Sequence, residues 1–470
     1  MKRIRISRRA LALAVLPSML VLILGSSSPV SAASRVIWQH VFATSGGNNA
    51  FWAVANAPDG SAIYATGVLR DPNTHADGIE TIAYDPASGN TLWEARYFGG
   101  FGYDIPSSVT VSPDGLSVYI VGSTQTTTNL DWLVVAYSAS DGTQRWVQTY
   151  DGVNHENDSA TGVAVSPDNA TVFVTGGAWE GTHPITVPTT AAYGAARGDE
   201  LWRTTDETAH YGQGSSIAVS PDGSRVDVSG SFYGNGGNLP LTRTWSFDSA
   251  TGAESWRSTF LGAPGGNSMN GMKMSPDGSR LYLTAQVFSG TGYIAVFSLD
   301  ASTGAQVWKV QTDGPARLGA SPGGLDVTPD GSQILIGGDV NRAGKQRAFF
   351  LWSIASATGA PQWKRVYQRK GDSYDAAYLL AISPDGASAY VTGIACASLY
   401  CNLFARSWLT TAYSLPDGVL KWTARFGSAN ADNRAGAIVV TPDSTKLVVV
   451  GDSYSTNLGD RLAVIAYGTG

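Results

Sequence analysis

The sequence repeats one unit eight times, and this repeat constrains the fold more than any other feature. A Pro-Asp pair begins at eight positions spaced 53 to 58 residues apart, which are Pro58, Pro113, Pro167, Pro221, Pro276, Pro329, Pro384 and Pro442. A tryptophan recurs at a similar spacing, at Trp38, Trp93, Trp146, Trp202, Trp256, Trp308, Trp363 and Trp422. A long period filled with short strand-like runs is typical of propellers and other repeat architectures.

Each copy predicts four short strands joined by tight turns. Apolar residues alternate or form short runs bounded by Gly, Pro, Asp and Ser, which favours strands over helices. The Pro-Asp-Gly sequence at 113–115 suits a turn, because the glycine supplies the positive φ needed to enter the next strand. Asn169 and Ser444 replace this glycine in two copies. Asn tolerates the left-handed region, whereas Ser444 predicts a strained or different turn.

The two ends of the chain complement each other. The run around Trp38 is a lone strand, and the last run stops where a tryptophan strand should follow. We therefore predict an all-β fold, an eight-bladed β-propeller of four-stranded antiparallel blades, closed by pairing of the N-terminal strand with the C-terminal blade. Trp38 should share a sheet with Val448 and Ala463. A solenoid is the alternative, but it predicts atypical capping repeats at both ends and leaves open sheet edges.

The first 33 residues differ from the repeats. Five basic residues precede an apolar run over 11–24, and small residues around Ala32 suit a signal peptidase. We predict a cleaved signal peptide at 1–33 and a single propeller over 34–470, which makes the protein secreted and leaves no membrane span. The sequence Ser-Arg-Arg-Ala-Leu at 7–11 resembles a twin-arginine signal. A membrane anchor is the alternative, although the apolar run is short and interrupted.

Removal of the leader makes the chain strongly acidic. The leader holds five of the 31 basic residues and none of the 37 acidic ones, so 26 basic residues remain against 37 acidic, a formal charge of −11. Because phosphate backbones would be repelled and no basic stripe offsets this charge, we predict no nucleic-acid partner. We expect a monomer.

Cys396 and Cys401 are the only cysteines. In an exported protein such a close pair predicts a local disulfide. A metal site is the weaker alternative, because two thiols alone rarely hold a metal ion.

The tryptophan strands carry a family resemblance. The stretches "AYDPASGNTLW" at 83–93, "SFDSATGAESW" at 246–256 and "SLDASTGAQVW" at 298–308 resemble the tryptophan-docking motif of eight-bladed quinoprotein dehydrogenases and other pyrroloquinoline-quinone-like repeat proteins. The resemblance covers the whole chain after the leader. It implies a structural role for all eight tryptophans, each packed against the neighbouring blade.

The same resemblance implies a cofactor only for the enzymes of the family. Those dehydrogenases hold their quinone beside a disulfide of adjacent cysteines and a calcium ion with carboxylate and amide ligands. This chain has no adjacent cysteines, and no motif matches those ligands. The motif is therefore evidence for blades and not for a cofactor.

The two faces of the predicted ring differ in sequence. The Pro-Asp-Gly and Thr-Gly turns vary little and share one face, which we call the constant face. The loops from second to third strand, and from fourth strand to the next blade, vary widely, as in "LRDPNTHAD" and "GAWEGTH". We call this second side the variable face and expect binding there, because variable loops on a rigid scaffold usually carry it.

Six polar residues recur nine positions before the prolines, namely Asn49, Asp104, Asp158, Asn267, Asp375 and Asn433. One interpretation is a site for calcium or a polar ligand at the mouth of the central channel. The other, which we favour, is that each side chain hydrogen-bonds its own loop backbone.

A histidine cluster is the second candidate site. His155, His183 and His210 fall in variable-face loops around the third and fourth blades, with Glu156 beside the first of them. These residue types could bind a transition metal or supply a base. Exposed loop histidines that belong to no site are the more common alternative.

The sequence contains no G-x-S-x-G, H-E-x-x-H or phosphate-binding glycine motif, and a fold does not carry a function with it. We predict a non-catalytic exported propeller that binds a protein, a polymer or a small ligand through its variable face. The alternative is an enzyme, either a quinone-dependent oxidoreductase or a metal-assisted hydrolase or lyase.

Overall fold

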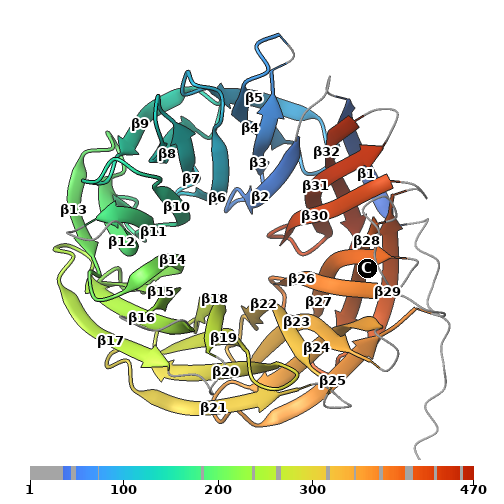
Figure 1. Cartoon of the computed structure of the whole chain (residues 1–470). Coiled ribbons are helices and arrows are strands. Elements are labelled where there is room, and N and C mark those ends of the chain that lie inside the picture. Colours follow the sequence, from blue (N-terminus) through green and yellow to red (C-terminus); the bar gives the residue numbers. More distant parts are fainter. Residues whose placement is uncertain are drawn as a thin grey trace, which may run out of the picture.

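The strands form eight four-stranded antiparallel blades around a central opening (Figure 1). The computed structural model describes residues 35–43, 49–71, 73–180, 185–234, 239–260, 266–313, 318–342, 346–369, 374–396, 406–427, 431–455 and 459–470. The predicted all-β, eight-bladed propeller is confirmed. Within these ranges no helix has the length and apolarity needed to cross a membrane. The predicted signal peptide at 1–33 lies outside them.

The first four blades follow the chain in order. Blade one contains β2 (Ala50–Asn56), β3 (Ile63–Arg70), β4 (Asp77–Tyr84) and β5 (Thr91–Tyr97). Blade two contains β6 (Ile105–Val111), β7 (Ser117–Gln125), β8 (Leu130–Ser138) and β9 (Gln144–Tyr150). Blade three contains β10 (Ser159–Val165), β11 (Thr171–Glu180), β12 (Ile185–Gly194) and β13 (Glu200–Thr205). Blade four contains β14 (His210–Val219), β15 (Arg225–Tyr233), β16 (Pro240–Asp248) and β17 (Glu254–Phe260).

The remaining blades complete the ring. Blade five contains β18 (Asn267–Met274), β19 (Arg280–Val287), β20 (Tyr293–Asp300) and β21 (Gln306–Thr312). Blade six contains β22 (Ala320–Val327), β23 (Gln333–Asn341), β24 (Arg347–Ala355) and β25 (Pro361–Tyr367). Blade seven contains β26 (Tyr374–Ile382), β27 (Ser388–Cys396), β28 (Arg406–Ser414) and β29 (Leu420–Phe426). Blade eight contains β30 (Ala431–Val440), β31 (Lys446–Ser455), β32 (Gly459–Gly468) and β1 (Val36–Ala43).

The two ends of the chain close the ring in one sheet. Strand β1 pairs antiparallel with β32, so that Trp38 lies opposite Ala466 and Val41 lies opposite Ala463. Strand β32 in turn pairs with β31, where Val448 lies opposite Ala466. The predicted pairing of the termini is therefore confirmed.

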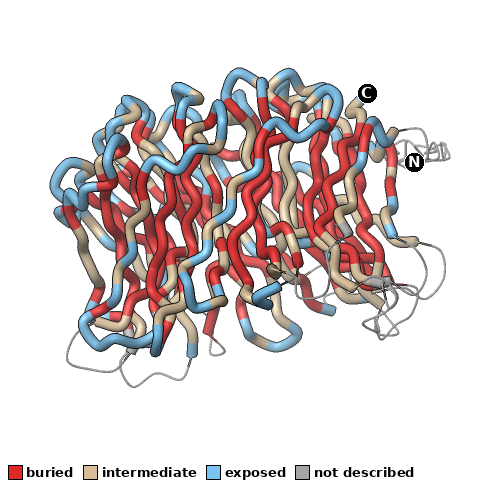
Figure 2. Tube along the Cα trace, turned by 90° about the horizontal axis from the view of Figure 1, so that it is seen from above, coloured by how far each residue is buried: buried red, intermediate tan, exposed pale blue. Residues whose placement is uncertain are grey.

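The core lies in the second and third strands of each blade. Residues of β3, β7 and β8 are almost all buried, whereas first and fourth strands mix buried and exposed positions. In Figure 2 the buried residues run through the strands and the exposed ones gather in the connections at both ends. The middle strands pack against neighbouring blades on both sides. Their sequences are therefore nearly continuous runs of buried, mainly apolar residues.

At seven of the eight joints, neighbouring blades are fastened by a tryptophan and a turn glycine. In blade one, the Nε1 of Trp93 donates to the carbonyl of Ala139 at 2.8 Å. A Cβ on Gly142 would lie 2.6 Å from the Trp93 ring, so only glycine lets this turn approach. Seven tryptophans donate in this way, namely Trp38, Trp93, Trp146, Trp202, Trp256, Trp308 and Trp363.

Trp422 is the exception. It is fully buried, yet its Nε1 has no hydrogen-bond partner within the described part of the chain. In the other blades the acceptor comes from the turn between the third and fourth strands. In blade eight the third strand is β32 and the fourth is β1, which are not consecutive in the sequence, so no such turn joins them.

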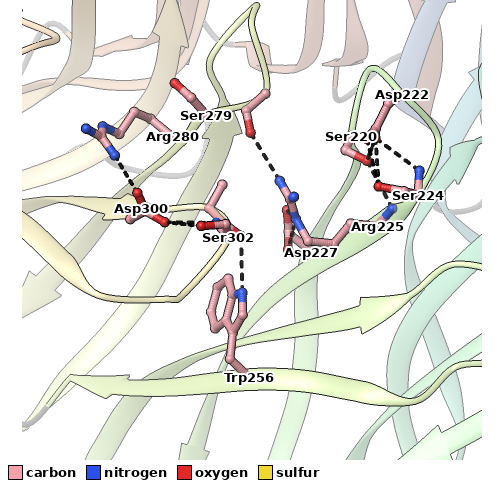
Figure 3. A network of polar contacts seen from close by, with 12 residues as sticks. Ser220, Asp222, Ser224, Arg225, Asp227, Trp256, Ser279, Arg280, Asp300 and Ser302 are labelled. Carbon is pink, nitrogen blue, oxygen red and sulfur yellow. Dashed lines mark hydrogen bonds and ion pairs between the residues drawn. The ribbon is translucent and has the colours of Figure 1, made fainter.

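The Pro-Asp-Gly turns are held by their own side chains and by the next blade (Figure 3). The Ser220 hydroxyl donates to Asp222 at 2.5 Å and accepts from the amide of Arg225 at 3.0 Å. The Arg225 guanidinium pairs with Asp227 at 2.9 Å and donates to the Gly278 carbonyl of blade five at 3.1 Å. The repeated residues of the constant face therefore hold the turns in shape and join neighbouring blades.

The two turns that lack glycine keep the same shape. Asn169 and Ser444 have φ values of 63° and 59°. The expectation of a different turn at Ser444 is therefore wrong, whereas the positive φ of this serine agrees with the expectation of a strained turn. Their side chains accept hydrogen bonds from the preceding blade, at the amides of Asp114 (2.9 Å) and Asp385 (3.0 Å). These contacts offset part of the conformational strain.

Candidate functional site

A cavity of about 870 Å³ lies where blades eight, one and two meet. Its lining residues come from the beginnings of β2, β4, β6, β30 and β32 and from the ends of β3 and β31, so it opens on the variable face. Blades eight and one approach closely here, because a Cβ on Gly436 would lie 2.2 Å from the Phe51 carbonyl oxygen. The cavity therefore sits beside the seam at which the ring closes.

Two large aromatic side chains are exposed in the cavity. Trp52 of β2 is 46% exposed and Tyr103, just before β6, is 43% exposed. Tyr103 is held in place by a parallel bridge between its backbone and that of Asp77. Exposed aromatic surface inside a concave site marks a binding site more often than scattered surface residues do.

Trp52 is exposed because the strand bulges at this residue. The pairing of β2 with β3 shifts register between Phe51 and Ala53, which leaves Trp52 as an extra residue. Every first strand has a shift at the position six residues before its proline: Trp52, Ser107, Thr161, Ser215, Asn270, Gly323, Tyr378 and Gly436. The first strands surround the central opening in Figure 1.

Sequence reasoning missed this position. It counted nine residues back from each proline, whereas the bulged residues lie six back. A regular alternation of apolar and polar residues does not reveal an inserted residue. The sequence did contain a signal for this site. Six residues before the proline, two copies of the repeat carry a large aromatic residue, Trp52 and Tyr378, where the other copies carry smaller residues.

Buried carboxylates form the polar wall of the cavity. Arg434 Nη2 lies 2.7 Å from Asp432 Oδ2, while Arg406 Nε lies 3.6 Å from Asp432 Oδ1. Arg70 Nη1 lies 3.8 Å from Asp77 Oδ1. At these distances neither Oδ1 atom receives a hydrogen bond within the described residues, although Asp77 and Asp432 are only 8% and 6% exposed.

Two further carboxyl groups with raised pKa values line the cavity. Burial raises the pKa of Asp452 to about 7, although the positive charge of Arg434 opposes the shift and the charge of Asp432 adds to it. Burial also raises the pKa of Asp460. The amide of Arg434 donates to Asp452 Oδ1 at 3.1 Å, which fixes the carboxyl group in the wall.

The six predicted Asp and Asn residues are all buried. Their side chains hydrogen-bond to backbone groups or pair with a neighbouring arginine. Asn49 accepts from the amide of Arg70 at 2.7 Å, and Asp104 accepts from the amide of Gly99 at 2.7 Å. The other contacts are Asp158 with the Trp179 amide, Asn267 with the Phe260 carbonyl, Asp375 with Arg369, and Asn433 with the Arg406 carbonyl.

Asp104 and Asn267 bond the backbone of their own loops, which is the interpretation that we favoured. Asn49 and Asn433 instead bond the backbone of other segments, and Asp375 bonds an arginine. Of the six residues, Asn49 is the only one that lines the cavity. A calcium site at the six positions stays a prediction.

The predicted histidine cluster is described only in part. His155 is exposed, with its Nδ1 2.6 Å from Asp151 Oδ2, and this hydrogen bond raises the pKa of His155. The backbone oxygen of Glu156 accepts from Asn129. His183 and the side chain of His210 lie outside the described residues. Metal binding by this cluster stays a prediction.

Cys396 ends β27, is buried and is disulfide-bonded. Cys401 lies outside the described residues. The pairing of these two cysteines therefore stays a prediction.

The cavity does not fit the quinone and calcium of the quinoprotein dehydrogenases. Two of its carboxylates, Asp77 and Asp432, are already paired with arginines. Among the described residues, no three His, Cys, Asp or Glu side chains gather closely enough to hold a metal ion. The disulfide at Cys396 cannot join adjacent cysteines, because the sequence has none.

Comparison with known proteins supports the fold. A family model described as outer membrane protein assembly factor BamB matches residues 130–391 and 243–467, which together span more than half of the chain. A search of the curated proteins found no match.

Two solved structures illustrate the likeness. The Dos1 propeller is 12% identical with a TM-score of 0.58, and the alignment covers 93% of this chain and 96% of that one. A quinohemoprotein alcohol dehydrogenase from Comamonas testosteroni is 12% identical with a TM-score of 0.56, over 93% of this chain and 76% of that one. At such identities the likeness shows the fold alone.

Proposed function

Because the chain belongs to the pyrroloquinoline-quinone-like propeller family described as outer membrane protein assembly factor BamB, we propose that it is an exported, non-catalytic binding propeller. Its ligand occupies the cavity between blades eight, one and two. The basic and apolar pattern of residues 1–33 supports export. The family description names an assembly factor, a role that rests on binding.

The observation that carries this proposal is that one cavity combines exposed aromatic surface with carboxyl groups. Trp52 and Tyr103 are 46% and 43% exposed, and Asp77, Asp432 and Asp452 line the same cavity. A ligand that covers the rings would remove apolar surface from water, and its donors could bond to the carboxyl groups.

The lining residues favour binding over covalent chemistry. None of the described residues that line the cavity is a serine, cysteine, lysine or histidine. The cavity thus lacks four of the usual nucleophiles and bases of hydrolytic sites, and its carboxyl groups are the remaining candidates for such chemistry.

One observation favours a second candidate function. The pKa of Asp452 is raised to about 7, which is the range that suits a general acid or base. A hydrolase acting on the bound ligand through Asp452 is therefore the alternative. Mass spectrometry of the ligand after incubation would reveal turnover, and Asp452→Asn should abolish it if this alternative holds.

Replacing Trp52 by alanine should remove ligand-induced stabilisation. The mature chain would be heated with neutral tetrasaccharides, with tetralysine and with tetraglutamate, each in a separate titration. At a hundredfold excess over its dissociation constant, a ligand stabilises the folded state by about 2.7 kcal/mol and so raises the melting temperature. We expect at least one class to do so for the native chain but not for Trp52→Ala.

Tyr378→Ala is the matched control for this measurement. Tyr378 occupies the equivalent bulge in blade seven and is 43% exposed, but it does not line the cavity. It should keep the full stabilisation. A shift of equal size in Trp52→Ala and in the native chain would contradict the proposed site.

A further inference from the structure

We propose that the cavity binds a neutral carbohydrate, an oligosaccharide segment that lays a sugar ring on the exposed aromatics and donates hydroxyl hydrogen bonds to the buried carboxylates. This inference rests on the proposed function, because it names the class of ligand for the same cavity.

The aromatic residues supply the apolar half of the recognition. Trp52 and Tyr103 come from neighbouring blades and line one cavity, with nearly half of each side chain exposed. A pyranose ring has a face of C–H groups that packs on an aromatic ring, and a rim of hydroxyls that remains free for hydrogen bonds. The rings contribute contact area with little loss of conformational freedom, because each has only two side-chain torsions.

The carboxylates supply the polar half. The carboxyl groups of Asp77, Asp432 and Asp452 line the cavity. Asp77 Oδ1 and Asp432 Oδ1 are shielded and lie toward arginines, so a ligand meets the accessible remainder of these side chains, which are 11% and 8% exposed. Hydroxyl groups can donate to carboxyl oxygens, and a hydrogen bond to an ionised carboxylate is among the stronger ones. Carboxyl groups from two different blades would fix the orientation of a ring that lies on Trp52.

Charge balance favours a neutral ligand over a cation. Asp77 and Asp432 are already paired with Arg70 and Arg434, so a lysine or another amine would compete for charges that are neutralised. Burial raises the pKa of Asp452 and of Asp460, so these two groups attract a cation less than exposed carboxylates would. An anion would be repelled by the same two groups whenever they are ionised.

The size of the cavity agrees with this class. Ligand pockets of about 300–1,000 Å³ bury most of a drug-sized molecule, and the cavity falls in the upper part of this range at about 870 Å³. A single sugar ring would leave much of the cavity empty. We therefore infer an oligosaccharide.

Isothermal titration calorimetry of the mature chain tests this inference. The probes are cellotetraose, maltotetraose, mannotetraose and chitotetraose, with tetralysine and tetraglutamate as charged comparisons. At least one neutral tetrasaccharide should bind, while neither charged peptide does. Trp52→Ala and Asp432→Asn should each weaken that binding at least tenfold, because one removes the stacking face and the other a charged acceptor.

Two variants serve as matched controls. Tyr378→Ala removes the equivalent exposed aromatic of blade seven. Asp131→Asn changes a buried carboxylate of blade two whose Oδ1 also lacks a donor among the described residues but does not line the cavity. Both should keep the affinity of the native chain within about twofold. Asp77→Asn provides a second test of the polar half should Asp432→Asn fail to fold.

The possible failures separate the two proposals. Trp52-dependent binding of a charged peptide, with no tetrasaccharide bound, would overturn the carbohydrate assignment and leave the cavity as the binding site. Binding that Trp52→Ala leaves unchanged would overturn both proposals. Absence of heat with every probe, confirmed at millimolar concentrations, would also count against both.

Discussion

Deletion of residues 36–43 should open the ring and lower the free energy of unfolding by about 5 kcal/mol or more. These residues form β1, the outer strand of blade eight, which pairs with β32 along its length. The deletion also removes Trp38, which is 8% exposed and donates to the Pro86 carbonyl of blade one at 3.0 Å. Burial of a tryptophan of about 200 Å² alone accounts for up to ~5 kcal/mol.

Guanidinium denaturation of residues 34–470 with and without β1 would measure this loss. Trp38→Ala is the informative partner variant, because it keeps the strand pairing and loses only the contact with blade one. It should destabilise the protein less than the deletion does. The deletion should also promote self-association, because it exposes the edge of β32. An unchanged unfolding midpoint after the deletion would show that the termini do not hold the ring.

Replacing Trp146 by alanine should lower the free energy of unfolding by about 3–5 kcal/mol, the range found for large aromatic residues in cores. The ring of Trp146 packs on the turn glycine of blade three, where a Cβ on Gly198 would lie 2.7 Å away. Its Nε1 donates to the Ala195 carbonyl at 2.9 Å. Both contacts join blade two to blade three, so their loss loosens a joint between blades.

The phenylalanine variants separate packing from hydrogen bonding. Trp146→Phe should lose the bond to Ala195 and cost about 1–2 kcal/mol beyond the loss of volume. Trp422→Phe should cost less, because the Nε1 of Trp422 has no partner to lose within the described residues. Denaturation curves of the two variants would be compared directly. Equal losses would mean that the hydrogen bond contributes nothing to the joint between blades.

The architecture could be predicted because two markers keep one period through the chain. The prolines give the number of blades, and the unpaired strand around Trp38 shows how the ring closes. Each marker reports a local structure, a tight turn or a buried indole, that has to be repeated in every blade. The pairing of β1 with β32 then follows, because each terminus lacks what the other supplies.

The site was harder to predict for two physical reasons. The bulge at Trp52 interrupts the alternation of the strand, so counting from Pro58 does not tell which residues face the opening. The cavity also joins residues from opposite ends of the chain, such as Trp52 and Asp432, which meet only after the ring closes. Of the six Asp and Asn residues that the spacing selected, all but Asn49 lie outside the cavity lining, as Asp104 does with its bond to the Gly99 amide.

Hydrogen–deuterium exchange of residues 34–470, with and without a probe that raises their melting temperature, tests the binding cavity most directly. Amides in β2, β30 and β31 should exchange more slowly when the probe is bound, because these strands line the cavity. Amides in β14, which does not line it, should be unchanged. Protection confined to blades three to six, or to the Pro-Asp-Gly turns of the constant face, would contradict the assignment of the site.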